Sequence, residues 1–400
     1  MKSGSYRSIL KIVLHGRSAV NILLATVLSF TFSIAVILCT FGLMDGFDHL
    51  LKSGLRHSSG DVLVTSRKGF FPFSSELERS IRTVDPLAVA PVIQTEAFAL
   101  FQGKSKGVLV RGIDGESFSK ATGLKVQVSP GEIVVGEELG KQLGLKPGDQ
   151  MALTLGKGNE ASEALPGVKL FTVRGLTKHG IYQKDLRFVY LDRSDLGEFL
   201  GVGNRINLIL LSSADPNLPL ENLDTVKKTQ EDLRRELDPD FYVKPFWSEY
   251  SFLIEAVKVE KFSISLILQL IVVVAVFNIM AFVIYIMEKK AQDFFFLRAV
   301  GLSLNSLLRF WLVSIFLIWS VSCVGAHLMS QIFNWGLQHL PFLQIPGEIY
   351  VLSSLSIRLD FTAYATVYLV SLLWILMAAF GGYIRIRNKP IIQGLRQEFT

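Results

Sequence analysis

The sequence has little charge and almost no cysteine. Of its 400 residues, 19% are charged and 50% are hydrophobic, and the mean hydropathy is +0.40. This is too apolar for an ordinary soluble enzyme and too charged for a chain that lies wholly in lipid, so part of the chain must be in a membrane. The only cysteines, Cys39 and Cys323, fall in apolar runs. They give no disulfide framework and are expected to act as small buried hydrophobic residues.

Motifs for nucleotide hydrolysis, metal binding and nucleophilic catalysis are missing. The nearest approach to a G-x-x-x-x-G-K-[ST] phosphate loop starts at Gly136, but it is one residue short and has Gln142 where a hydroxyl is needed. The six histidines are scattered, and no G-x-S-x-G elbow is present. We therefore expect neither catalysis, nor a cofactor, nor a metal site in this chain alone.

Charged residues are absent from the middle of four long apolar stretches. These stretches cover residues 19–44, 262–287, 307–329 and 361–384, and each is long enough to cross a bilayer as a helix of roughly 20 residues. The first is longer than the apolar core of a signal peptide, so it is expected to be an anchor. The lack of a mid-span charge disfavours an ion-driven transporter.

Lys and Arg gather on one side of these stretches. Among the short segments between and around the stretches, residues 1–18, 288–309 and 385–400 each contain four Lys or Arg, whereas the segment 330–360 contains only Arg358. Short loops rich in Lys and Arg stay in the cytoplasm. Both termini and the loop after the second stretch are therefore expected in the cytoplasm, and the insert between the first two stretches is expected outside it.

This insert, residues 45–261, has nearly balanced acidic and basic residues, which argues against nucleic-acid binding. Short β-rich runs bounded by Gly, Pro and Asp predict strands, and segments of helical periodicity are interleaved with them. The predicted strands begin at Asp61, Gly107, Glu132, Met151, Leu170, Arg187 and Ile206, and the predicted helices cover residues 74–82, 137–143, 194–200 and 222–237. Residues 103–201 hold most of the strands and are expected to form an inserted subdomain.

The predicted fold is an α-helical membrane protein with four transmembrane helices and a large α+β extracytoplasmic domain inserted between helices 1 and 2. The pattern Phe252, Ala256, Val259 runs into the second span with no Gly or Pro. The second helix is therefore expected to extend beyond the membrane surface, where it would couple movement of the domain to movement of the span.

The cytoplasmic loop after the second span has the pattern of a short amphipathic helix. Phe294 and Leu297 share a helical face, and Gly301 is placed to end the helix. Composition alone favours a helix lying on the lipid surface. The segment also resembles the E-I-A-x-L-R-A-x-G loop of the MacB/FtsX/lipoprotein-release permeases. The matching positions are Asp293 in place of Glu, Leu297, Arg298, Ala299 and Gly301, and the departures are Gln292 and Phe295.

Three further blocks resemble the LolC/LolE-type lipoprotein-releasing permeases of ABC transporters. Residues 42–47 look like that branch's M-N-G-F block, residues 134–149 like its V-G-x-x-L-A-x-x-L-G block, and residues 274–280 like its A-A-F-N-I block. The resemblance implies a multi-pass permease of the bacterial inner membrane that works with a cytoplasmic ABC ATPase subunit and a second permease copy or paralogue. It also implies a lipoprotein substrate drawn from membrane lipid and a periplasmic carrier chaperone that receives it.

The resemblance also suggests roles for particular residues. Asp293, Phe294, Leu297, Arg298 and Gly301 are expected to contact the ATPase. The loop around Leu165 and Pro166 is expected either to hold the chaperone or to be a hairpin tip with no partner. Residues of an apolar stripe at the outer end of span one are expected to line a lipid-substrate cavity or, alternatively, to pack on the outer domain; they are Leu43, Met44, Phe47 and Leu51.

Three functions stay open at this point. The first is release of lipoproteins, the second is MacB-like export of another substrate, and the third is FtsX-like signalling across the membrane to a cell-wall hydrolase. A neighbouring ATPase gene would not separate them because all three use one.

Overall fold

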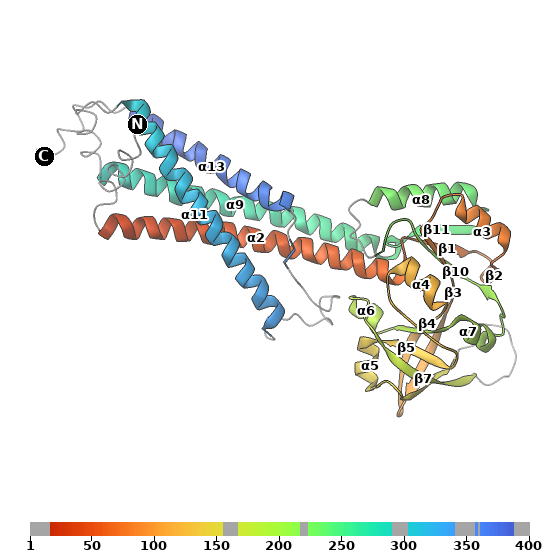
Figure 1. Ribbon diagram of the computed structural model, residues 1–400. Helices are drawn as coiled ribbons and strands as arrows, with labels where there is room; N and C mark the ends of the chain where they lie inside the picture. Colours follow the sequence, from red (N-terminus) through yellow and green to blue (C-terminus); the bar gives the residue numbers. More distant parts are fainter. Residues whose placement is uncertain are drawn as a thin grey trace, which may run out of the picture. The chain divides into compact units, whose positions relative to one another are not determined.

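The computed structural model describes residues 17–154, 167–216, 223–289, 303–340, 357–358 and 361–387. The chain divides into two compact units. Residues 1–46, 257–343 and 356–400 make up a helical unit, and residues 47–256 and 344–355 make up a second unit that is α+β, as the sequence predicts. Figure 1 shows the elements of both.

Long helices make up the described part of the helical unit (Figure 1): α2 (Arg17–Ser59), α9 (Ser251–Lys289), α11 (Leu304–His339) and α13 (Phe361–Arg387). Within the described residues, Val20–Ser59 and Leu312–His339 are long and apolar enough to cross a membrane, and Phe361–Met377 is a shorter apolar helical stretch. Helices α2 and α9 continue without a break into the α+β unit. The helix pattern that begins at Phe252 is continuous with the second apolar stretch, since α9 begins at Ser251; its extension beyond a membrane surface stays a prediction.

Small residues allow the helices of the helical unit to pack closely. A Cβ added to Gly325 of α11 would lie 3.0 Å from the Cγ2 of Thr31 on α2, and the hydroxyl of Ser322 donates to the carbonyl of Val27 over 3.4 Å. Small and hydroxyl-bearing residues are typical of such interfaces in membranes, where close backbone approach gives van der Waals contact. Of the two free cysteines, Cys323 is buried as expected and Cys39 is half-buried.

The described part of the α+β unit is built on one long sheet, in the order β11-β1-β10-β3-β4-β8-β5-β7-β6. The strands are β1 (Val62–Ser66), β3 (Ala88–Phe101), β4 (Lys104–Ile113), β5 (Glu132–Gly136), β6 (Gln150–Thr154), β7 (Val168–Thr177), β8 (Phe188–Asp192), β10 (Leu208–Ser212) and β11 (Phe241–Pro245). A separate short pair joins β2 (Phe71–Pro72) and β9 (Arg205–Ile206).

Strand β3 belongs to two halves of this sheet. Its first part, from Ala88 to Val92, pairs with β10, and its second part, from Ile93 to Phe101, pairs with β4. The second part also pairs with β6, so β3, β4, β8, β5, β7 and β6 close into a barrel. A closed barrel leaves no free edge on these strands. The barrel thus contains residues 93–101 in addition to the described strands of the segment 103–201.

Short helices pack on the sheet, and several of them begin directly after a strand (Figure 1). They are α3 (Ser75–Arg82), α4 (Gly115–Thr122), α5 (Glu137–Leu143), α6 (Tyr182–Asp185), α7 (Arg193–Leu200) and α8 (Leu223–Glu236). Helix α8 packs on β11 and β1, and α4 packs on β3 and β10. Under α4, the rings of Phe118 and Tyr190 lie 5.3 Å apart in a core that also contains Leu210.

Most elements of the α+β unit agree with the sequence pattern. The predicted helices over residues 137–143 and 222–237 are confirmed as α5 and α8, and each run predicted as a strand contains one. The longest strand, β3, was not predicted. Its successive residues Val92 and Ile93 are both buried because the strand changes partners there, and Pro91 is unusual inside a sheet. Period-2 alternation is therefore lost where the strand passes into the barrel.

Candidate functional site

The C-terminal end of the first apolar stretch carries charged and polar contacts within the helical unit. Asp45 of α2 forms an ion pair with Lys261 of α9. The carbonyl of Gly42, one turn earlier, accepts a hydrogen bond of 2.9 Å from the backbone N–H of Arg358. These contacts hold α2, α9 and the segment before α13 together where the apolar stretches give way to charged residues.

The residues expected to line a lipid cavity have different surroundings. Leu43 and Met44 in the helical unit and Phe47 in the α+β unit are half-buried, whereas Leu51 is fully buried. Full burial agrees with the packing alternative at Leu51. The cavity role of the other three stays a prediction.

A small cavity of 130 Å³ lies inside the helical unit between α2, α9 and α13. Its apolar wall includes Phe30, Ile37 and Leu268, and Ile37 packs directly on Leu268. Ser33 and Gln269 add polar groups to the lining. Since apolar walls with few polar groups suit hydrocarbon better than water, the cavity is compatible with a lipid chain.

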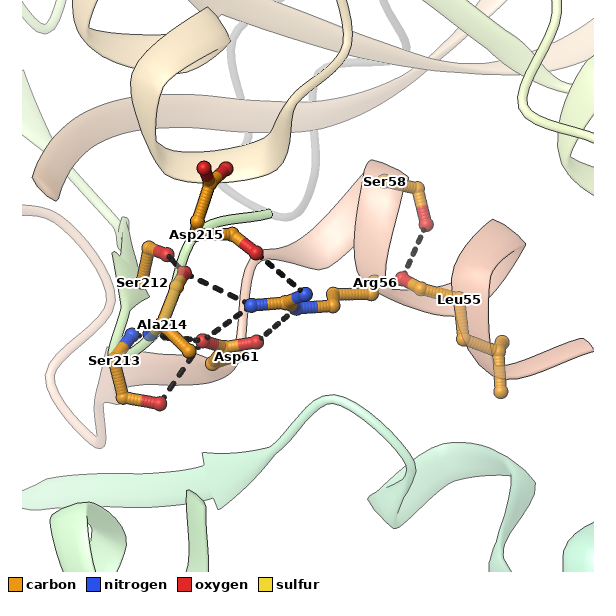
Figure 2. A network of polar contacts seen from close by, with 8 residues as sticks. All are labelled: Leu55, Arg56, Ser58, Asp61, Ser212, Ser213, Ala214 and Asp215. Carbon is orange, nitrogen blue, oxygen red and sulfur yellow. Dashed lines mark hydrogen bonds and ion pairs between the residues drawn. The ribbon is translucent and has the colours of Figure 1, made fainter. Parts of the chain in front are cut away.

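Arg56, in the last turn of α2, binds a buried acceptor site in the α+β unit. Figure 2 shows its guanidinium aimed at Asp61 and at two backbone carbonyls. Its Nε lies 2.5 Å from Asp61 Oδ1, and its terminal nitrogens donate to the carbonyls of Ala214 at 2.9 Å and Asp215 at 3.0 Å. The side chains of Arg56 and Asp61 are 3% and 0% exposed. A pair this deeply buried is tolerated only because the remaining polar atoms are also bonded.

The other oxygen of Asp61 completes this network (Figure 2). Asp61 Oδ2 accepts hydrogen bonds from the backbone N–H and hydroxyl of Ser213, at 2.7 and 2.9 Å, and from the N–H of Ala214 at 3.1 Å. The network joins the end of α2 to the segment that follows β10. Movement of the last turn of α2 therefore has to move this part of the sheet or break charge-assisted hydrogen bonds.

Two further cations, one on a barrel strand and one on α6, contact the same turn of α2. Arg111 of β4 donates to the carbonyl of Ser58, and Lys184 of α6 donates to the hydroxyl of Ser58 and, over 3.4 Å, to that of Ser59. Cations suit this place because the last carbonyls of a helix lack intrahelical partners and carry partial negative charge. The end of α2 is thus fixed both to the sheet and to the barrel.

The same cations contact aromatic rings and the start of the second long helix. Arg111 Cζ lies 4.4 Å from the centre of the Phe188 ring. Lys184 Nζ lies 5.5 Å from the centre of the ring of Tyr250, which belongs to the 3-10 helix η1 (Ser248–Tyr250) directly before α9. Attraction between a cation and a ring face is strengthened by burial. Lys184 therefore contacts the end of α2 and the residue next to the start of α9.

Titratable groups around this cluster are strongly perturbed. Burial, followed by the nearby charge of Arg111, lowers the pKa of Lys184 to about 7. Burial lowers the pKa of His179, although Asp185 opposes this by bonding its Nδ1 at 2.6 Å. The Nε2 of His179 lies 2.6 Å from the Tyr190 hydroxyl, whose own pKa burial raises. Within the described residues, no cluster of three metal-ligating side chains occurs.

Two of the predicted sites lie outside the described residues. They are the ATPase contact at Asp293, Phe294, Leu297, Arg298 and Gly301 and the chaperone contact at Leu165 and Pro166. Both stay predictions.

The contacts of Arg56, Arg111 and Lys184 at the last turn of α2 were not predicted from the sequence. Its members come from α2, β4 and α6, and single Lys and Arg residues in a mixed-charge domain give no spacing signal. The one available sign was the apolar stripe with helical spacing that runs past the first stretch to Leu51, ten residues before the strand predicted at Asp61. The order of elements predicts that the end of the first helix lies near the strand at Asp61. The burial of Arg56, Arg111 and Lys184 depends on the fold.

The model of the MacB-like periplasmic core domain matches residues 23–228, which is more than half of the chain. The chain belongs to this family. The match covers most of α2 and of the α+β unit, including the Arg56, Arg111 and Lys184 positions, and it ends within α8.

Curated relatives confirm the resemblance inferred from the motifs. The lipoprotein-releasing system transmembrane protein LolC of Xylella fastidiosa is 24% identical over 397 residues, which is 94% of this chain and 94% of that protein. LolC of Neisseria meningitidis is 26% identical over 314 residues, covering 69% of this chain and 74% of that protein. Among solved structures, the periplasmic region of MacB from Actinobacillus actinomycetemcomitans has a TM-score of 0.33 at 16% identity, covering 48% of this chain and 92% of that one.

Proposed function

We propose that this chain is the permease subunit of an ABC transporter that releases lipoproteins from the inner membrane of a bacterium. The observation that carries the proposal is the similarity to LolC proteins over almost the full length of both chains. Such a match includes the helices and the α+β unit together, so it is not confined to a domain that many transporters share. A separate ATPase subunit supplies the energy, and a second permease copy or paralogue completes the membrane part.

The proposed topology has four spans with both termini in the cytoplasm and the α+β unit in the periplasm. It is supported by the apolar helices α2, α11 and α13 and by the distribution of Lys and Arg. The proposed span boundaries are residues 19–44, 262–287, 307–329 and 361–384. The remaining part of each long helix projects from the membrane, most of all in α2 and α9.

Extraction of a lipoprotein requires work that this chain cannot supply alone. Each acyl CH₂ taken from a bilayer costs about 0.8 kcal/mol, so several chains need both ATP hydrolysis and an apolar receiving surface. In the proposed cycle, the loop around Leu297 and Arg298 receives the movement of the ATPase. Helices α2 and α9 transmit it to the α+β unit, where the loop with Leu165 and Pro166 holds the receiving chaperone.

The lipid substrate is proposed to contact the outer end of α2 at Leu43, Met44 and Phe47. A photo-crosslinking residue at Met44 is expected to capture lipoprotein in the absence of ATP and to lose it when ATP is added. The same residue at the fully buried Leu51 is the matched control, since it should capture only this chain. Capture at Met44 of nothing but neighbouring parts of the chain would contradict the cavity role and support packing.

Depletion of this protein tests the proposed function as a whole. Lipoproteins destined for the outer membrane are expected to accumulate in the inner membrane fraction within a few generations, while integral inner-membrane proteins keep their usual level. A normal lipoprotein distribution after complete depletion would contradict lipoprotein release. Loss of export of another substrate, or of cell-wall hydrolase activity, would then identify which other function applies.

A further inference from the structure

Lys184 occupies an unusual position for a lysine. It is 6% exposed, and its ammonium contacts the hydroxyls of Ser58 and Ser59 and the ring of Tyr250. Arg111, itself 3% exposed, bonds the carbonyl of Ser58 in the same place. Two cations are therefore buried around one turn of helix.

The nearby carboxylates do not neutralise these two cations directly. Asp185, next to Lys184 in the chain, accepts from the backbone N–H and the Nδ1 of His179, both at 2.6 Å. Glu249 of η1 is exposed and attracts Lys184 only from a distance. Among the residues whose positions the structure describes, neither Lys184 nor Arg111 forms an ion pair with a carboxylate.

The remaining groups that face Lys184 keep one charge state over the neutral range. Arg111 on β4 stays protonated even though burial lowers its pKa. Burial disfavours the charged forms of His179 and of Tyr190 on β8, and Tyr250 is likewise held neutral by burial. On α2, the charge of Arg56 is bonded to Asp61, and burial lowers the pKa of His57, next to Ser58, which disfavours its charged form. Lys184 is thus the group in this cluster that changes charge most easily.

We propose that Lys184 is a proton-controlled pin that fixes the end of α2 to the barrel when it is neutral and releases it when it is protonated. The neutral amine keeps its hydrogen bonds to Ser58 and Ser59 and removes the repulsion from Arg111. The ammonium gains hydration and the attraction of exposed Glu249 when it leaves the pocket. Since burial costs far more for a charged group than for a neutral one, protonation favours release.

The direction of the pH effect follows from proton binding. In the pinned state the pKa of Lys184 is about 7, whereas a hydrated lysine has its ordinary value of 10.5. The pinned state therefore binds fewer protons between these values, and its share rises with pH across that interval. Linkage gives a roughly 100-fold rise in the ratio of pinned to released state between pH 6 and pH 9. The pin would change how firmly the last turn of α2 is held to the barrel within the α+β unit, a consequence whose role in transport rests on the proposed function.

Distance measurements on the full-length protein in lipid nanodiscs test the pin. Spin labels are placed at Ser53, in the last two turns of α2, and at Lys146, in an exposed loop of the barrel, after Cys39 and Cys323 are replaced by Ala. The wild-type background is expected to show a broad or double distance distribution at pH 6 and a single narrow one at pH 9. Identical distributions at the two pH values would overturn the proposal.

Three variants separate the pin from other titrations. Lys184→Met is expected to give the narrow distribution at both pH values because its side chain is never charged. Lys184→Arg is expected to give the broad distribution at both because a guanidinium is not deprotonated. Lys120→Met, at an exposed lysine of the same unit, should keep the wild-type pH response.

Lys184→Met alone tests the proposal, even if Lys184→Arg fails to fold. A pH response in Lys184→Met equal to that of the wild type would overturn the proposal. Because the distance measurement needs neither an ATPase nor a lipoprotein, it can fail while lipoprotein release holds, and it can succeed while lipoprotein release fails.

Discussion

Replacement of both Leu297 and Arg298 by Asp is expected to abolish ATP turnover by the assembled transporter and the co-purification of its ATPase subunit. The pattern predicts an amphipathic helix whose apolar face includes Phe294 and Leu297. We propose that this face docks in a groove of the ATPase, where two Asp carboxylates would be buried without partners, and burial of an unpaired charge costs several kcal/mol. A loss of that size reduces an association constant by more than a thousandfold.

The control variant makes the same change in net charge on the surface of the α+β unit. Lys125 and Gln127 are exposed in the α+β unit, so Asp at both positions should leave ATPase binding and turnover unchanged. Melting of the α+β unit should be the same in both variants and the wild type. If the Leu297 and Arg298 variant retained the ATPase with full turnover, the contact would lie elsewhere in the chain.

The sequence predicts the larger features of this fold because they rest on local patterns. Long apolar runs give the helices, and Gly-bounded β-branched runs give most strands. Helix α5 matches its predicted range because its residues fall between the strand at residues 132–136 and Gly144, which adopts the left-handed backbone conformation that ends a helix. Such signals need no knowledge of distant residues.

The contacts between the end of α2 and the barrel join residues that are far apart in the sequence. For that reason no local pattern predicts them. Arg111 lies 53 positions after Ser58, and Lys184 lies 126 positions after it. Strand β3 connects the two halves of the sheet, and its change of partner at residues 92 and 93 removed the alternation that identifies strands. A buried Lys has the same sequence signal as an exposed one, so only the fold distinguishes Lys184 from Lys120.

The buried pair in the last turn of α2 gives the largest expected change in stability. Arg56→Met removes the guanidinium and leaves the Asp61 carboxylate, which is 0% exposed, without a counter-charge. Loss of one partner of a buried pair costs about 3–5 kcal/mol. The three hydrogen bonds that Asp61 accepts from Ser213 and Ala214 offset part of this loss, so the lower end of the range is expected.

Two further variants test whether the loss of stability in Arg56→Met comes from the unpaired Asp61 carboxylate. Lys52→Met removes the partially exposed pair with Asp48, one turn earlier on the same helix, and should change the unfolding free energy by less than about 1 kcal/mol. Arg56→Met combined with Asp61→Asn should recover much of the lost stability, because the amide keeps an acceptor for Ser213 without a buried charge. Denaturant unfolding of the full-length protein measures all three, followed by the fluorescence of Trp247 after the four tryptophans of the helical unit are replaced by Phe. Equal losses for Arg56→Met and Lys52→Met would mean that the network does not anchor α2 to the sheet.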